Sequence, residues 1–378
     1  MKTLLPEGEG GAQRSWEDEG LGSHRIEHLD SLEPNPAPFH VRERARAPSS
    51  PYRRGDLASI QHLRAVAALA VVTYHALQWR TGGFDVGRAG VDVFFVISGL
   101  VMWTSTVGRD VTPGGFVWRR FIRVAPLYWI ATLVTASAAL AWPEFLPQIL
   151  PGWRHLTLSL AFIPHFDPKG LPFPTLPLGW TLDYEAIFYL VFAGAMFAPR
   201  AWRAKLITGV LATFVAAGFL LDDPLYILGA NPMLLQFAAG LWLGVAIERR
   251  ILPSRAWGWA MIVLAVAGWL IVQTTGSFVE FWRPFQWGIP ATLLVAGAVT
   301  IETRGGWPKL PPMRRMGDAS YSIYLWHPAA IAVVAHLLGY RGGAFVPLAI
   351  LAAILAGLAS HARLETPLLA ALRRFRAR

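Results

Sequence analysis

Long apolar stretches recur along the chain from about residue 57 onward, separated by short segments rich in Pro, Gly and charge. A helix of about 20 residues crosses the roughly 30 Å hydrocarbon layer of a membrane, and ten stretches approach that length. The expected membrane helices are 57–79, 89–107, 124–142, 180–197, 204–221, 230–248, 256–275, 285–302, 318–339 and 344–363. The pattern therefore predicts an all-α, polytopic membrane protein with about ten transmembrane helices.

The segments outside these helices divide the chain into three parts. Residues 1–56 are rich in Pro, Gly, Ser and charge and contain no apolar core of a signal peptide, which predicts a disordered cytoplasmic N-terminal tail. Residues 57–370 form the expected membrane domain, and 371–378 a basic cytoplasmic C-terminal tail. The longest gap between expected helices, 143–179, carries a short apolar stretch at 156–163 that is expected to lie in the membrane interface or to re-enter the bilayer.

Lys and Arg are distributed unevenly between alternate loops. The loops on one side hold 19 of these residues and those on the other side hold 6. Because positive loops stay in the cytoplasm, this asymmetry predicts a membrane protein with both termini cytoplasmic. The formal net charge of +10 is then mainly a topology signal, and nucleic acid is not an expected partner.

Composition narrows the chemistry further. The chain is 54% apolar and only 15% charged, which excludes an ordinary water-soluble domain. It contains no Cys, and this excludes disulfides, thiolate zinc sites, Fe–S clusters and a cysteine nucleophile. We expect no metal at the site.

Ionisable residues inside the apolar stretches are the first candidates for function, because charge at membrane depth is costly. Arg64 and His75 are eleven residues apart on the first helix, about 20° from whole turns with a rise of about 16 Å. They are therefore predicted to share one face, with Arg64 towards the cytoplasm and His75 in the outer half. The alternative for His75 is a core histidine that hydrogen-bonds a neighbouring helix.

Carboxylates also enter the apolar stretches from the outer side. Asp183 and Glu185 begin the fourth helix and project about 200° apart, so at most one can face a given cavity centre. We expect Glu185 to be the deeper, functional one and Asp183 to be interfacial. Asp92 lies at a similar depth on the second helix, and a carboxylate beside His75 would fix its tautomer. The sequence therefore predicts one cavity surrounded by His75, Asp92 and Glu185.

The loop before the third helix ends in a pair of arginines. Arg120 and Arg123 are i, i+3 neighbours on one helical face, close enough together to bind a phosphate or pyrophosphate. Ordinary positive-inside charge is the alternative explanation. With Arg64, they are expected to line the cytoplasmic continuation of the cavity.

Five segments in order along the chain resemble the acyltransferase-3 family of bacterial membrane acyltransferases, particularly members that acetylate exopolysaccharides. They cover essentially the whole of residues 57–370. The segments are Arg64 to His75, Gly90 to Gly99 with Asp92 and Ser98, Arg120 to Tyr128 with Arg123 and Pro126, Trp180 to Tyr189 with Glu185, and Gly317 to Pro328 with Tyr321, Tyr324 and His327.

The resemblance implies a ten-helix transferase. Its donor substrate would be acyl-CoA, usually acetyl-CoA, from the cytoplasm, and its acceptor a sugar hydroxyl of an envelope or secreted glycan such as exopolysaccharide. A lipid-linked glycan and the polysaccharide biosynthesis machinery are further partners that it implies. His75 and the pair Arg120 and Arg123 match the family's functional residues, and Arg64 matches the arginine that precedes the histidine.

Two mechanisms and two other functions stay open at this point. His75 can act as the general base on the acceptor hydroxyl or can itself carry the acyl group. Buried carboxylates and histidines are also how proton-coupled secondary transporters are built, although the chain has no internal repeat. A glycan export component is the other alternative.

Overall fold

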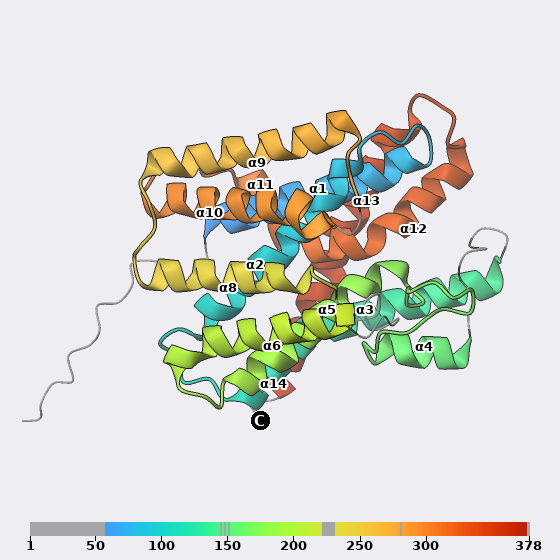
Figure 1. The fold of residues 1–378 in the computed structure, drawn as a ribbon. Coiled ribbons are helices and arrows are strands. Elements are labelled where there is room, and N and C mark those ends of the chain that lie inside the picture. The colour runs from blue at the N-terminus through green and yellow to red at the C-terminus, as the bar shows by residue number, and fades with distance from the viewer. Residues whose placement is uncertain are drawn as a thin grey trace, which may run out of the picture. The chain divides into compact units, whose positions relative to one another are not determined.

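The fold is described by a computed structural model that covers residues 57–143, 146, 149, 152–220, 231–279 and 282–375, all within the unit Pro51–Arg378. In these ranges every regular element is a helix, and no strand is present (Figure 1). The predicted all-α class is confirmed for this part of the chain. The expected tail 1–56 lies outside the described residues.

Each of the ten expected stretches contains a helix. The helices are α1 (Ala58–Gln78), α2 (Ala89–Thr106), α3 (Pro113–Ala141), α4 (Trp153–Leu160), α5 (Trp180–Ala195), α6 (Arg200–Leu220), α8 (Leu234–Glu248), α9 (Arg255–Thr275), α10 (Ile289–Thr303), α11 (Pro311–Asp318), α12 (Ser320–Leu338), α13 (Phe345–Ser360) and α14 (Thr366–Phe375). Single turns join some of them and are η1 (Asp85–Arg88), η2 (Pro177–Gly179), η4 (Pro284–Gly288) and η5 (His361–Glu365).

Six helical stretches among the described residues are long and apolar enough to cross a membrane. They are Asp85–Thr106, Pro113–Ala141, Arg255–Thr275, Pro284–Thr303, Ser320–Leu338 and Phe345–Arg374. The helix α8 is apolar but has only 15 residues. The six stretches support an integral membrane protein, and the predicted number of about ten spans is not confirmed by length and composition.

The helix α3 begins earlier than its apolar stretch predicts. Thr112 precedes the helix, and its Oγ1 accepts a hydrogen bond from the backbone N–H of Gly115 at 3.1 Å. Pro113 follows at the first helical position, where its missing N–H costs nothing. This start places the basic residues of α3 on a continuous helix.

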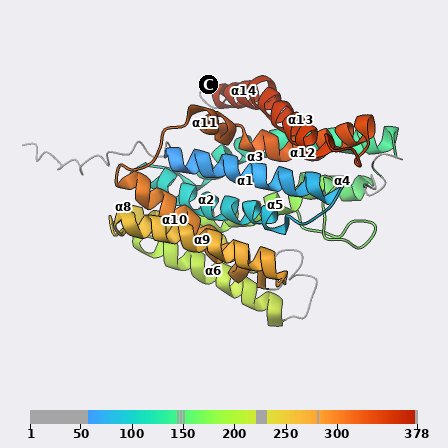
Figure 2. The same ribbon diagram turned by 90° about the horizontal axis from the view of Figure 1, so that it is seen from above.

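The helix α2 lies at the centre of the bundle, and most of its 18 residues are buried. It packs against α1, α5, α8 and α10, while α1 packs in turn against α11 and α12. Figure 2 shows α1 and α2 between α12 and α13 on one side and α9 and α10 on the other. Most side chains of α2, and those on one side of α1, therefore face the interior of the bundle.

Two glycines bring α2 and α8 into backbone contact. A Cβ added at Gly240 would lie 1.8 Å from the carbonyl oxygen of Val96, and one added at Gly99 would lie 2.0 Å from that of Phe237. Both distances are far below contact distance, so only glycine fits at these positions. Small residues at helix interfaces are how helices approach closely in membranes.

The helix α1 is anchored at its start by a carboxylate from another helix. The backbone N–H groups of Ala58 and Ser59 each donate a hydrogen bond of 2.8 Å to the carboxylate of Glu302, at the end of α10. An anion at a helix N-terminus satisfies free N–H groups and complements the helix dipole. This contact sets the axial position of α1, which carries Arg64 and His75.

The predicted short apolar stretch in the long gap largely coincides with α4. Ser159 and Leu160, at its end, accept hydrogen bonds through their carbonyl oxygens from Tyr128 and Trp129 of α3, at 3.2 and 2.7 Å. At the other end of the chain, α14 extends to Phe375. The first residues of the expected C-terminal tail are therefore helical.

We expect Gly240→Ala to destabilise the protein by about 1–3 kcal/mol, because the added methyl must push α2 and α8 apart. Thermal unfolding in lipid nanodiscs, followed by intrinsic Trp fluorescence, measures the effect. Gly209→Ala in α6 is the matched control, since a Cβ there meets no atom within 4 Å. Equal unfolding temperatures for the two variants would contradict this packing account.

Candidate active site

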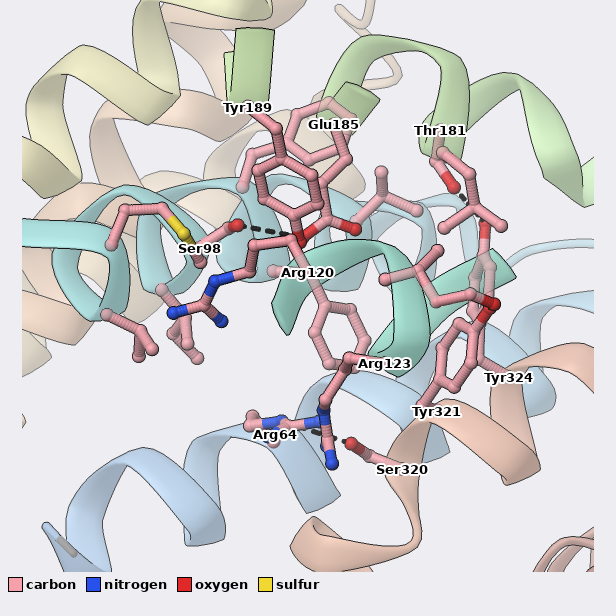
Figure 3. Close-up of a pocket in the computed structure, with 18 residues that line it drawn as sticks. Arg64, Ser98, Arg120, Arg123, Thr181, Glu185, Tyr189, Ser320, Tyr321 and Tyr324 are labelled. Carbon is pink, nitrogen blue, oxygen red and sulfur yellow. Dashed lines mark hydrogen bonds between the residues drawn. The ribbon is translucent and has the colours of Figure 1, made fainter. Parts of the chain in front are cut away.

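Three arginines from α1 and α3 line one cavity of about 130 Å³ inside the bundle (Figure 3). Arg64 comes from α1, and Arg120 and Arg123 come from α3. The other walls are formed by α2, α5 and α12. We call this space the inner cavity. It brings together the three arginines that the sequence predicted as a group.

Hydroxyl groups hold two of the arginines in place. Arg64 donates through Nε to Ser320 Oγ at 3.1 Å. Arg120 donates through Nη2 to Ser105 Oγ at 2.9 Å. Neither hydroxyl neutralises the guanidinium charge.

Arg123 has a carboxylate partner behind the cavity. Its Nη1 lies 3.6 Å from Glu365 Oε1. Glu365 is buried, and its Oε2 also accepts from Ser322 Oγ and from His361, at 2.8 and 2.9 Å. This carboxylate therefore fixes Arg123 without lining the cavity.

Glu185 of α5 faces the three arginines across the inner cavity (Figure 3). Its Oε1 accepts a hydrogen bond from Ser98 Oγ at 2.8 Å and another from the Tyr189 hydroxyl. Among the residues lining the inner cavity, Glu185 is the one carboxylate beside three guanidinium groups. The lining consequently carries net positive charge, which suits an anionic ligand.

His75 of α1 lines a second, larger cavity of about 590 Å³, which we call the outer cavity. Charged and polar side chains alternate with aromatic rings on its walls. Val91 and Tyr324 line both cavities, so the two spaces adjoin at these side chains. The Tyr324 hydroxyl lies 3.0 Å from Thr181 Oγ1 at this divide. Arg64 and His75 therefore lie in adjoining spaces along one helix.

Hydrogen bonds fix the proton on His75. Its Nδ1 lies 2.9 Å from the Val71 carbonyl oxygen, and His327 Nδ1 lies 2.7 Å from the Tyr324 carbonyl oxygen. A carbonyl oxygen only accepts, so both Nδ1 atoms carry the hydrogen. His327 Nε2, 3.1 Å from His75 Nδ1, then accepts from the same N–H. Neutral His75 therefore has its basic lone pair on Nε2.

Asp92 does not join His75, contrary to the sequence expectation. It is fully buried and lines neither cavity. Its Oδ2 pairs with Arg283 Nη2 at 3.1 Å, and its Oδ1 accepts from the Gln236 amide. The predicted single cavity around His75, Asp92 and Glu185 is wrong. Arg283, the residue just before η4, forms an ion pair with Asp92 instead.

The two carboxylates of α5 face different cavities. Glu185 lines the inner cavity and Asp183 lines the outer cavity with His75. The predicted 200° separation accounts for this, since it places them on nearly opposite faces of α5. Asp183 is only 5% exposed, so its side chain is buried within the protein.

The segment after α4 brings a second histidine pair to the wall of the outer cavity. His165 lines the cavity, and its Nδ1 donates to the Ile163 carbonyl oxygen at 2.7 Å. Its Nε2 lies 2.7 Å from His155 Nδ1. Burial and the adjacent His165 lower the pKa of His155. The pair braces the wall that carries His165.

No group of three or more His, Asp or Glu side chains within the described ranges is placed to hold a metal ion. The chemistry of the two cavities is therefore considered through their own arginine, histidine and carboxylate side chains.

The chain is similar to membrane acyltransferases over most of its length. A family model described as an acyltransferase domain matches residues 57–361. The exopolysaccharide production protein ExoZ of Rhizobium meliloti is 38% identical over 314 residues, which are 81% of this chain and 96% of that protein. The peptidoglycan O-acetyltransferase OatA of Listeria monocytogenes is 26% identical over 76% of this chain but only 51% of its own length.

The chain matches no solved structure. The family match covers both cavities and all three arginines, and the relatives include an O-acetyltransferase. The protein is a membrane-bound O-acyltransferase that belongs to the acyltransferase-3 family.

Proposed function

We propose that the protein transfers an acyl group, with acetyl as the first candidate, from acyl-CoA to a hydroxyl of an exported or cell-surface carbohydrate such as exopolysaccharide. The observation that carries this proposal is the pair of adjoining cavities. One is lined by three arginines and the other by a histidine with its lone pair on Nε2. The resemblance to ExoZ favours an exopolysaccharide acceptor.

The inner cavity is the proposed site of the donor. Phosphate groups of acyl-CoA are anions, and Arg64, Arg120 and Arg123 provide more positive charge than the single lining carboxylate offsets. At about 130 Å³ the cavity is smaller than a typical ligand pocket. We therefore assign it to a phosphate and the adjacent pantetheine arm, and not to the adenosine.

Distance along α1 also fits a donor of this kind. Arg64 and His75 are separated by eleven residues, or about 16 Å of helix rise. An extended pantetheine arm of roughly 15–20 Å would therefore carry its thioester from the arginines to the histidine. The arm would pass Tyr324 and Val91, which line both cavities.

His75 is the proposed general base. Its Nε2 takes the proton of an acceptor hydroxyl while the hydroxyl oxygen bonds to the thioester carbon. The C–S bond then breaks, and the imidazolium returns its proton to the CoA sulfur. The Val71 carbonyl and His327 stabilise the imidazolium through Nδ1. The sequence analysis had expected a carboxylate in this role. The same lone pair would serve an acyl-histidine route.

Glu185 is proposed as a site residue on the donor side. Its bonds with Ser98 and Tyr189 hold the carboxylate towards the arginines. Its negative charge would offset part of the repulsion between the guanidinium groups before the donor binds. We do not propose Asp92 as a catalytic group, because its contacts are with Arg283 and Gln236.

The topology proposed for this function has residues 57–370 as one membrane domain of ten spanning helices in the bacterial inner membrane. Both termini would then be cytoplasmic, and the arginines would face the compartment that contains acyl-CoA. The excess of Lys and Arg in alternate loops supports this orientation. A secondary transporter or a non-catalytic export subunit is not favoured, since the chain is a family acyltransferase.

We expect His75→Ala to lower acyl transfer by about 10²–10⁴-fold and to leave acyl-CoA affinity unchanged, because only the base is lost. Purified protein in nanodiscs, radiolabelled acetyl-CoA and the host's own deacetylated surface glycan measure transfer. His336→Ala, an exposed histidine of α12, is the control. Normal esterification of the glycan by the His75 variant would rule out the assignment.

We expect His327→Ala to slow transfer by up to about tenfold. It removes one neutral hydrogen bond to His75 Nδ1, worth about 0.5–1.5 kcal/mol, while the Val71 carbonyl still fixes the tautomer. The pH dependence of transfer separates this role from simple loss of packing, since only a contact to the base moves the profile. An unchanged rate and profile would show that the contact between the histidines has no role.

We expect Arg120→Ala and Arg123→Ala each to weaken acyl-CoA binding by about 10- to 150-fold, because each removes about 1.5–3 kcal/mol of charge-assisted hydrogen bonding to a phosphate. Acceptor preference should stay the same. Arg119→Ala is the matched control, since Arg119 lies beside Arg120 in the sequence and lines neither cavity. Unchanged affinity in both test variants would leave these arginines with a topological role alone.

A further inference from the structure

Asp183 is a buried carboxylate whose Oδ1 has no hydrogen-bond partner among the described residues. It lies in the first turn of α5 and lines the outer cavity with His75. Its Oδ1 is buried and makes no hydrogen bond, and its carboxylate forms no ion pair with any described residue. An unsatisfied polar group in such a place costs free energy, which a ligand that supplies a donor would recover.

Glu185, two residues further along α5, shows what a satisfied carboxylate looks like in this bundle. It receives hydrogen bonds from Ser98 and Tyr189. Arg283 lines the same cavity, and its guanidinium is paired with Asp92 at 3.1 Å. The Asp183 carboxylate can therefore accept a hydrogen bond from a ligand in the outer cavity.

The composition of the outer cavity indicates the kind of ligand. Its volume of about 590 Å³ is in the range of small-molecule sites. Aromatic side chains, Trp180 and Phe173 among them, offer apolar faces, and Asn231 and Gln78 offer hydrogen bonds. Two guanidinium groups line the same space, which disfavours a cationic ligand. A neutral, hydroxyl-rich ring fits this lining.

We propose that Asp183 accepts a hydrogen bond from a second hydroxyl of the acceptor sugar, and so presents a different hydroxyl of the same sugar to His75. This inference rests on the proposed acyltransferase function and adds to it a residue that determines specificity. The acceptor must then carry at least two free hydroxyls. A site built to bond a hydroxyl discriminates strongly against an analogue that lacks it.

The test is a cycle between the carboxylate and the hydroxyls of a defined acceptor. The full-length protein in nanodiscs is given labelled acetyl-CoA with methyl β-D-glucopyranoside or with each of its four monodeoxy derivatives. The acceptor kcat/KM is measured for wild type, Asp183→Ala and Asp183→Asn. Asp85→Ala is the control, an exposed aspartate of η1 that lines neither cavity.

In the wild type, one derivative should not react because it lacks the acylated hydroxyl. Another should lose about 10- to 150-fold in kcat/KM because it lacks the partner of Asp183. Asp183→Ala should lower the kcat/KM for the parent sugar to the wild-type value for that second derivative. The kcat/KM for the second derivative should not change. Asp183→Asn, which keeps an acceptor oxygen, should lie between, and Asp85→Ala should match wild type.

If Asp183→Ala has the same kcat/KM as the wild type for every sugar, the inference is overturned while the proposed function stands. An equal loss for every sugar would also overturn it, since Asp183 would then act through no single hydroxyl. Acetyl-CoA affinity is measured in parallel and should be the same in all variants. Failure of the wild type to bind acetyl-CoA, or to acylate any of the five sugars, would instead contradict the proposed function.

Discussion

Three guanidinium groups share a small cavity inside an apolar helix bundle, where an ionised group costs about 2.5–3.5 kcal/mol on insertion scales. Another buried guanidinium group, that of Arg283, has a carboxylate partner in Asp92. In the inner cavity three arginines face one lining carboxylate, Glu185, and Glu365 behind the cavity pairs with Arg123, so positive charge is still in excess. An anionic substrate group would offset this excess. The proposed use of acyl-CoA follows from this imbalance.

The helix α1 connects the positively charged inner cavity with the outer cavity. It carries Arg64 in one cavity and His75 in the next, and Glu302 fixes its start. The backbone contact between α2 and α8 holds the centre of the bundle, so the two cavities keep their separation. A helix that holds Arg64 and His75 at a fixed separation suits a reaction in which donor and acceptor reach one base from opposite directions.

Helical periodicity in the sequence predicted which side chains share a face, and for Arg64 with His75, for Arg120 with Arg123 and for Asp183 against Glu185 the structure agrees. Periodicity does not say which other helix packs against that face, so a predicted partner of His75 was wrong. Asp92 was expected beside His75 but meets Arg283, 191 residues away.

The partner of His75 was missed for the same reason. His327 was visible as an ionisable residue within a family-like segment of the ninth expected helix, but it lies 252 residues from His75. A hydrogen bond between two histidines has no sequence signature, whereas burial of both in apolar helices could have suggested that they meet. Asp183 similarly shares its cavity with residues of the segment after α4, whose path local sequence does not set.

Under the proposed function, an acyl group passes through the bundle from one side of the membrane to the other. Proteoliposomes with labelled acetyl-CoA sealed inside and a membrane-impermeant glycan acceptor outside measure this directly. Labelled ester is expected on the outside glycan, with the released CoA retained in the lumen. Transfer that occurs only when donor and acceptor are on the same side would contradict passage through the bundle.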